Sequence, residues 1–160
     1  MRHRILLGVI CLLAIPFLAW READPGSFNG IPWGSDIGQE TGFVVLKEIR
    51  DFKICSRKSE SHQIDGVEVE EIRYEFYKNK FYSATMKFNG DRNFRSFLDC
   101  LSLRYGPPVS RMKYPEEYEW SSHGLNVILR YFQSDKNGSL EYLYKPIFDQ
   151  ITREENCCTP

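Results

Sequence analysis

The sequence predicts an α+β fold in which an antiparallel sheet of two hairpin or meander units packs against one principal amphipathic helix, residues 91–105. Strand-like alternation over residues 71–77 and 81–89, an apolar stripe at helical spacing, and three further strand-like segments predict this class. The chain has 160 residues, of which 42% are hydrophobic and 27% charged. This profile fits one globular domain, and we expect it to span residues 24–160.

The first 23 residues are predicted to be an export segment rather than part of the fold. Two arginines and a histidine in residues 1–4 precede an uncharged apolar run over residues 5–20, which is the pattern of a signal peptide. As a helix the run is about 24 Å long, shorter than the ~30 Å hydrocarbon core, and Pro16 would kink it. Two alternatives stay open: a cleaved signal peptide, or a retained N-terminal anchor whose residues 5–20 alone contact the membrane. In both, the domain is exported across the cytoplasmic membrane, and it is periplasmic or anchored.

Residues 24–42 are predicted to form an ordered segment of turns. Glycines recur at positions 26, 30, 34, 38 and 42. Among them lies a compact apolar group, Phe28, Ile31, Pro32 and Trp33. Because such glycines mark turns, these apolar side chains must pack against another part of the chain. Residues 42–51 then favour a first strand or a helix-to-strand junction, and the polar residues 53–66 predict a loop.

A β-hairpin is the clearest feature of the middle of the chain. In residues 71–77 charged side chains alternate with Ile72, Tyr74 and Phe76. Lys78-Asn79-Lys80 predicts the turn, and residues 81–89 the returning strand. The core face of that second strand is predicted to carry Tyr82, Ala84, Met86 and Phe88.

The helix over residues 91–105 follows directly. Its apolar stripe consists of Phe94, Phe97, Leu98, Leu101 and Tyr105. Asp91 is the predicted N-cap, and Gly106 followed by two prolines ends the helix.

An antiparallel meander is predicted after the helix. Its three strand segments are residues 118–121, 125–132 and 139–145. Turn-forming residues at 122–124 and 134–138 separate them. Ile147, Phe148 and Ile151 favour a short C-terminal helix, and residues 152–160 are expected to form a flexible tail.

Export permits disulfides, and four cysteines lie beyond the export segment: Cys55, Cys100, Cys157 and Cys158. Adjacent cysteines rarely bond to each other because the small ring strains the peptide. The favoured pairings are therefore Cys55 and Cys100 each with one cysteine of the tail, or a single Cys55–Cys100 bridge. Four free thiols are the remaining alternative.

No catalytic residue, metal ligand or cofactor is predicted. His62 lies in a serine-rich segment and His123 in a turn, and neither belongs to a nucleophile or metal motif. The formal net charge of −1 gives no basic surface for nucleic acid. One enzymatic alternative stays open, a small envelope enzyme that uses Cys55 or the Cys157–Cys158 pair as thiol together with His62.

Aromatic residues are the candidate binding groups. The chain has 9 Tyr, 11 Phe and 3 Trp, more than the predicted core stripes require. Strand alternation places several tyrosines outside the core, drawn from Tyr77, Tyr114, Tyr118, Tyr131, Tyr142 and Tyr144. Tyr and Trp are favoured at binding surfaces, although Tyr is also simply a good strand residue. The binding candidates are Trp33, Tyr118, Trp120, Tyr142 and Tyr144.

Four short segments carry a resemblance to a group of small exported bacterial proteins that open with a Phe-x-Gly-Ile-Pro-Trp-Gly stretch after the signal. The segments are Phe28-Asn29-Gly30-Ile31-Pro32-Trp33-Gly34, Tyr74-x-Phe76, Tyr105-Gly106-Pro107-Pro108 and Tyr118-Glu119-Trp120. The resemblance implies a bacterial envelope location and a small mixed domain, and it carries no catalytic residue. The hypothesis is a noncatalytic binding or assembly module of the cell envelope whose partner is another envelope protein. An inhibitor or immunity protein is a close variant.

Overall fold

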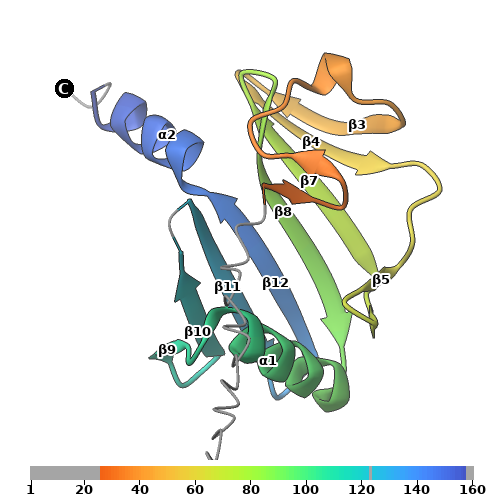
Figure 1. The fold of residues 1–160 in the computed structure, drawn as a ribbon, viewed down its shortest axis with the longest axis vertical. Helices are drawn as coiled ribbons and strands as arrows, with labels where there is room; N and C mark the ends of the chain where they lie inside the picture. Colours follow the sequence, from red (N-terminus) through yellow and green to blue (C-terminus); the bar gives the residue numbers. More distant parts are fainter. Residues whose placement is uncertain (1–25, 123, 158–160) are drawn as a thin grey trace, which may run out of the picture.

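The computed structural model describes residues 26–122 and 124–157. It has the predicted α+β fold, with one eight-stranded antiparallel sheet and two helices packed on it (Figure 1). The predicted export segment, including residues 5–20, and Cys158 lie outside the described residues. Neither of the two α-helices in the described part is long and apolar enough to cross a membrane.

The large sheet joins two four-stranded meanders edge to edge. The first meander contains β3 (Phe43–Ile49), β4 (Phe52–Arg57), β7 (Glu71–Tyr77) and β8 (Lys80–Asn89). The second contains β9 (Val109–Met112), β10 (Glu116–Ser121), β11 (Leu125–Phe132) and β12 (Asn137–Tyr144). The strand order is β3-β4-β7-β8-β12-β11-β10-β9. β8 and β12 are therefore the central pair, and their register runs from Asn89 opposite Asn137 to Ser83 opposite Leu143.

Two helices and two small hairpins complete the described fold. The helices are α1 (Asp91–Tyr105) and α2 (Lys145–Cys157), and a short 3-10 helix, η1, spans Ile37–Gln39. The hairpins are β1 (Ser27–Phe28) with β2 (Ile31–Pro32), and β5 (Gln63–Ile64) with β6 (Val67–Glu68). These two hairpins and α1 contribute residues to the main core. Tyr142 belongs to that core, whereas its neighbour Leu143 belongs to a second cluster with Ile151 of α2. Because successive strand residues point to opposite faces, α2 packs on the other face of the sheet.

The loop predicted at residues 53–66 is wrong, because this segment contains most of β4 and all of β5. β4 is an inner strand between β3 and β7, yet only its Cys55 is fully buried. Because Lys53, Ser56 and Arg57 are polar, the sequence of β4 does not show the run of apolar residues that is typical of an inner strand. The short strands β1, β2, β6 and β9 were also not predicted, because segments of two to four residues are too short to show a period.

A β-bulge corrects the predicted core face of β8. Phe76 lies opposite Phe81, but Glu75 lies opposite Ser83, so Tyr82 is the extra residue. The bulge turns Tyr82 to the α2 face, where its hydroxyl donates to Glu75 at 2.9 Å. Phe81, fully buried, takes the core position that the alternation assigned to Tyr82.

The two helices largely follow the prediction. α1 has the predicted bounds, but its N-cap is Gly90, with φ of 88°, and Asp91 is the first helical residue. The Asp91 carboxylate instead accepts a hydrogen bond from the Tyr131 hydroxyl at 2.7 Å. The predicted C-terminal helix is confirmed, and it includes residues 152–157, which were expected to be a flexible tail. Lys78 Nζ donates to Glu154 Oε2 at 2.7 Å, and this contact holds this part of α2 to the sheet. The hydrogen bond lowers the pKa of Glu154 to about 2.

The predicted Cys55–Cys100 bridge is not formed, because both are free thiols. Cys55 is on β4, opposite Tyr74, whereas Cys100 is on α1, which packs against β6, β8 and β11. The elements that hold the two cysteines are therefore separated on the sheet. Pairings with Cys157 or Cys158 involve side chains outside the described part and stay predictions.

Gly138 allows the central strands to pack. It was predicted to lie in a turn, but it is a residue of β12, between Tyr131 of β11 and Phe88 of β8. A Cβ atom at this position would lie 2.4 Å from Phe88 Cζ and 2.6 Å from the carbonyl oxygen of Arg130. The absence of a side chain lets Phe88 lie over the strand and contact Phe97 of α1, at 5.1 Å between ring centroids.

We expect Gly138→Ala to lower the free energy of unfolding by about 2–3 kcal/mol, because the methyl group would overlap both an aromatic ring and a backbone oxygen. Gly26→Ala is the matched control, since nothing lies within 4 Å of its added Cβ. Urea unfolding of the two variants measures the difference. Equal stabilities would contradict the close packing at Gly138.

Candidate functional site

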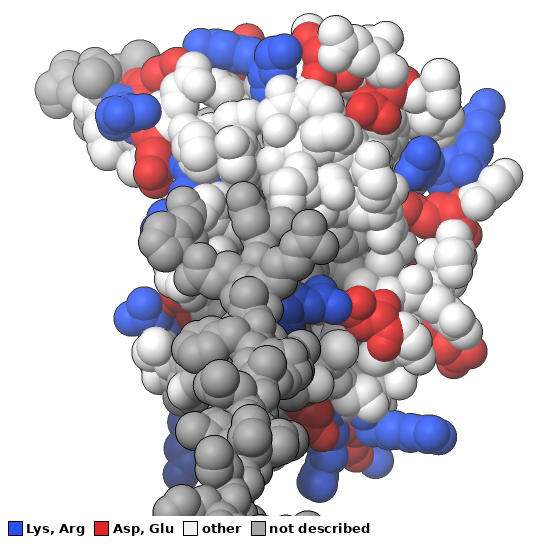
Figure 2. Space-filling view, in the orientation of Figure 1, with Lys and Arg blue, Asp and Glu red and all other residues white. Residues whose placement is uncertain are grey.

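Of the two faces of the sheet, the one that α1 covers is the better candidate for a binding surface. Figure 2 shows that uncharged side chains cover most of its visible described surface, with charged groups gathered toward the margins. Near the middle, one basic and one acidic group lie side by side. When a ligand or a partner covers an uncharged area of this kind, few charged groups lose their hydration, so the desolvation cost of binding is low.

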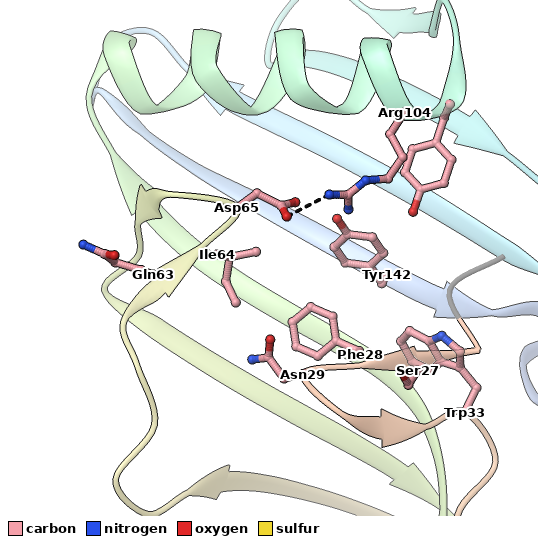
Figure 3. A pocket seen from close by; sticks show the side chains of 10 residues that line it. Ser27, Phe28, Asn29, Trp33, Gln63, Ile64, Asp65, Arg104 and Tyr142 are labelled. Atoms are coloured by element: carbon pink, nitrogen blue, oxygen red, sulfur yellow. Dashed lines mark hydrogen bonds and ion pairs between the residues drawn. The ribbon is translucent and has the colours of Figure 1, made fainter. Parts of the chain in front are cut away.

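A pocket of about 180 Å³ opens on this face where α1, the β1–β2 hairpin and the β5–β6 hairpin meet over β12 (Figure 3). Its lining residues are Ser27, Phe28, Asn29, Trp33, Gln63, Ile64, Asp65, Arg104, Tyr105 and Tyr142. Phe28, Ile64 and Tyr142 are buried, whereas Ser27, Asn29 and Gln63 are exposed. The pocket therefore has an apolar, largely aromatic floor and a polar rim.

Aromatic contacts fix the position of the β1–β2 hairpin. The Phe28 ring lies 5.4 Å from Tyr142 and 5.8 Å from Tyr74, between ring centroids. Trp33 stacks on Phe81 at 4.5 Å with 7° between the planes, and it is nearly parallel to Tyr144 at 6.1 Å. The backbone N–H of Gly34, with φ of 78°, donates to the Phe81 carbonyl oxygen at 2.8 Å. The Trp33 indole is thus held by rings of two sheet strands.

Arg104 and Asp65 are the two charged residues of the lining. Arg104 Nη2 donates to Asp65 Oδ1 at 2.8 Å, and both side chains are partly exposed. Asp65 raises the pKa of Arg104 further above its usual range. Since one positive and one negative group face each other, the pocket is neutral overall.

Two buried polar atoms of pocket residues have no hydrogen-bond partner. Trp33 Nε1 and the Tyr105 hydroxyl are buried and unbonded. The Tyr142 side chain is only 3% exposed, and its hydroxyl bonds to no described residue, although Figure 3 shows it directed toward Asp65 and Arg104. Burial, with Tyr105 and Asp65 nearby, raises the pKa of Tyr142 well above its usual value. A buried polar group without a partner costs about 1–3 kcal/mol, so these atoms mark the pocket as a place where a ligand can bind.

Comparable groups elsewhere in the core have partners. The Tyr131 hydroxyl donates to Asp91 at 2.7 Å, and Trp120 Nε1 donates to the Gly106 carbonyl oxygen at 2.9 Å. Tyr74 donates to Glu60 and accepts from Asn29 Nδ2 at 3.1 Å. The other buried, unbonded side-chain atoms in the described residues are two serine hydroxyls, at Ser35 and Ser83, which do not line the pocket.

Of the predicted binding residues, the structure brings three together. Trp33 and Tyr142 line the pocket, and Tyr144 is nearly parallel to Trp33. Tyr118 and Trp120 are on β10, away from the pocket. Tyr118 packs against Phe94 at 6.1 Å, and Trp120 is a core residue with 3% exposure.

Of the six tyrosines from which several were expected outside the core, three are buried. Tyr77, Tyr131 and Tyr142 are 6%, 2% and 3% exposed, whereas Tyr114 is 76% exposed. Tyr131 and Tyr142 belong to the main core on the α1 face, whereas Tyr77 belongs to the second cluster on the α2 face. Tyr131 follows the alternation of β11, in which Leu125, Val127 and Leu129 are also buried, so its residue type and not its place in the strand suggested exposure.

Sequence reasoning missed Arg104, Asp65, Tyr105 and Asn29 as site residues. Two local signals pointed toward them. Asp65-Gly66 has the sequence and the positive φ angles, 52° and 79°, of a two-residue hairpin turn, which projects Asp65 from its hairpin. Gly106 ends α1 and so places Arg104 and Tyr105 in its last turn.

The thiol-enzyme alternative finds little support in the geometry. Cys55 is 0% exposed, and burial raises the pKa of its thiol, which disfavours the reactive thiolate. His62 Nδ1 lies 3.2 Å from the Val69 carbonyl oxygen. Within the described ranges, no three His, Cys, Asp or Glu residues lie close enough to hold a metal ion.

The four segments that carry the sequence resemblance contact one another in pairs, and the first and third of them contribute residues to the pocket. Phe28 and Asn29 of the first contact Tyr74 of the second. Trp120 of the fourth donates to Gly106 of the third, next to the pocket residue Tyr105. Residues far apart in the sequence are thus in contact with one another. No protein-family model, curated protein or solved structure matches this chain.

We expect Tyr142→Phe to leave the free energy of unfolding within about 0.5 kcal/mol of the wild type, or to raise it, because the lost hydroxyl has no partner. Tyr131→Phe is the matched control, since it removes a hydroxyl bonded to Asp91 and should cost about 1–2 kcal/mol. Chemical denaturation of both variants provides the comparison. A larger loss in Tyr142→Phe than in Tyr131→Phe would show that the Tyr142 hydroxyl is satisfied inside the protein.

Proposed function

We propose that the chain is a noncatalytic binding module exported to the bacterial cell envelope, and that its binding site is the aromatic pocket. The observation that carries this proposal is that Trp33 Nε1 and the Tyr105 hydroxyl, both buried and without a partner, belong to residues of one pocket whose floor includes Tyr142, a residue only 3% exposed. Pockets lined by aromatic side chains with a few placed polar groups are the usual form of ligand sites.

Export and the partner class rest on the sequence. The basic residues 1–4 and the apolar run over residues 5–20 support delivery across the cytoplasmic membrane, and the resemblance supports a bacterial envelope location. Another envelope component is therefore the proposed partner. The burial of Cys55 and its raised pKa favour binding over thiol catalysis.

Capture from envelope extracts tests this proposal. Arg104→Gln removes the charged donor of the pocket, and Arg92→Gln makes the same change at the other end of α1, where the side chain is exposed. Folding should survive both, because a partly exposed ion pair contributes about 0–1 kcal/mol. We expect the wild type and Arg92→Gln to retain the same envelope component, and Arg104→Gln to retain about tenfold less.

Equal recovery of that component by all three proteins would contradict a binding role for the pocket. Recovery of no component by any of them would contradict the binding module itself.

A further inference from the structure

Three properties of the pocket restrict the chemistry of its ligand. The first is charge. Arg104 and Asp65 neutralise each other, and the other lining residues are uncharged. A charged ligand buried here would lack a free counter-charge, whereas a neutral ligand avoids this penalty.

The second property is an excess of hydrogen-bond donors. Trp33 Nε1 can only donate, and Arg104 keeps further N–H groups beyond the one bonded to Asp65. The Tyr105 and Tyr142 hydroxyls are also available to donate. On the acceptor side, Asp65 has a second carboxylate oxygen that bonds to no described residue. A ligand that offers one strong acceptor and one N–H donor satisfies both sides, and a secondary amide has this pair.

The third property is shape. The floor is closed by Tyr142 and Phe28, which are 3% and 7% exposed, so a chain cannot run through the pocket. The volume of about 180 Å³ is below the roughly 300–1,000 Å³ of a drug-sized site, so only a small terminal group enters. The rim residues Ser27, Asn29 and Gln63 are exposed, polar and uncharged, which suits a ligand body rich in hydroxyls.

We infer that the pocket binds the terminal acetamido group of an N-acetylated amino sugar. The acetamido methyl group would pack against the aromatic floor, and its carbonyl oxygen would accept from the tyrosine hydroxyls, the Trp33 indole or Arg104. Its N–H would donate to the free oxygen of Asp65, while the sugar hydroxyls would meet the polar rim. This inference rests on the proposed function, since it names the ligand of the same pocket.

The two indole N–H groups of the described domain provide the test, with ¹⁵N-labelled protein in NMR titrations. Trp33 Nε1 is unbonded in the pocket, whereas Trp120 Nε1 is bonded to Gly106 and serves as an internal reference. N-acetylglucosamine and acetamide should shift the Trp33 signal and leave the Trp120 signal unchanged. Glucose, which lacks the acetamido group, and acetate, which is acetamide's anionic counterpart, should shift neither.

Two variants separate a specific site from general surface binding. Tyr142→Phe should weaken the binding of N-acetylglucosamine about tenfold, because one buried hydrogen bond is lost. Tyr131→Phe should bind with wild-type affinity, since its hydroxyl faces Asp91 and not the pocket. Thermal unfolding of both variants checks that each is folded.

No shift of Trp33 with N-acetylglucosamine, or an equal shift in Tyr142→Phe, would overturn the inference. Binding of N-acetylalanine methylamide in place of the sugar would overturn it in favour of a peptide ligand. If the sugar fails but the Arg104-dependent capture from envelope extracts persists, the ligand assignment falls and the binding module stands. If both fail, the proposed function falls as well.

Discussion

A sheet of eight strands is wider than one helix can cover, and the architecture of the domain follows from this constraint. Neighbouring strands lie about 4.8 Å apart, so eight strands span roughly 34 Å, whereas a helix with its side chains is about 10 Å across. α1 therefore covers only part of the apolar face. The β1–β2 and β5–β6 hairpins cover much of the rest with Phe28, Ile31, Ile64 and Val67. The pocket lies where these separate covering pieces meet.

This way of covering the sheet explains why polar atoms of the pocket are left unsatisfied. A single long element would satisfy its backbone internally and bury a continuous apolar stripe. Here three elements end at one place, and each brings polar side chains: Trp33 from the first hairpin, Asp65 from the second, and Arg104 and Tyr105 from α1. Evolution tolerates such a loss of stability most readily at binding sites. The stability cost and the proposed function thus have the same origin.

Local patterns made much of the fold predictable. The alternation of residues 71–77 and the stripe of α1 depend on near neighbours, and both elements have the predicted bounds. The bulge at Tyr82 and the inner strand β4 depend on pairing with distant strands, so they could not be predicted. The pocket residues also divide into those that could be predicted from the local sequence and those that depend on distant parts of the chain. Trp33 and Tyr142 were found by residue type, whereas Arg104 and Asp65 are 39 residues apart and meet only through the topology.

The double variant Tyr105→Phe, Tyr142→Phe is the sharpest test of the pocket as a binding site, because it removes both tyrosine hydroxyls of the pocket and keeps both rings. Its thermal unfolding midpoint and its affinity for N-acetylglucosamine are to be measured on the same sample. We expect a midpoint at or above that of the wild type together with loss of sugar binding. A lowered midpoint with unchanged affinity would contradict this expectation, because the hydroxyls would then serve the fold and not a ligand.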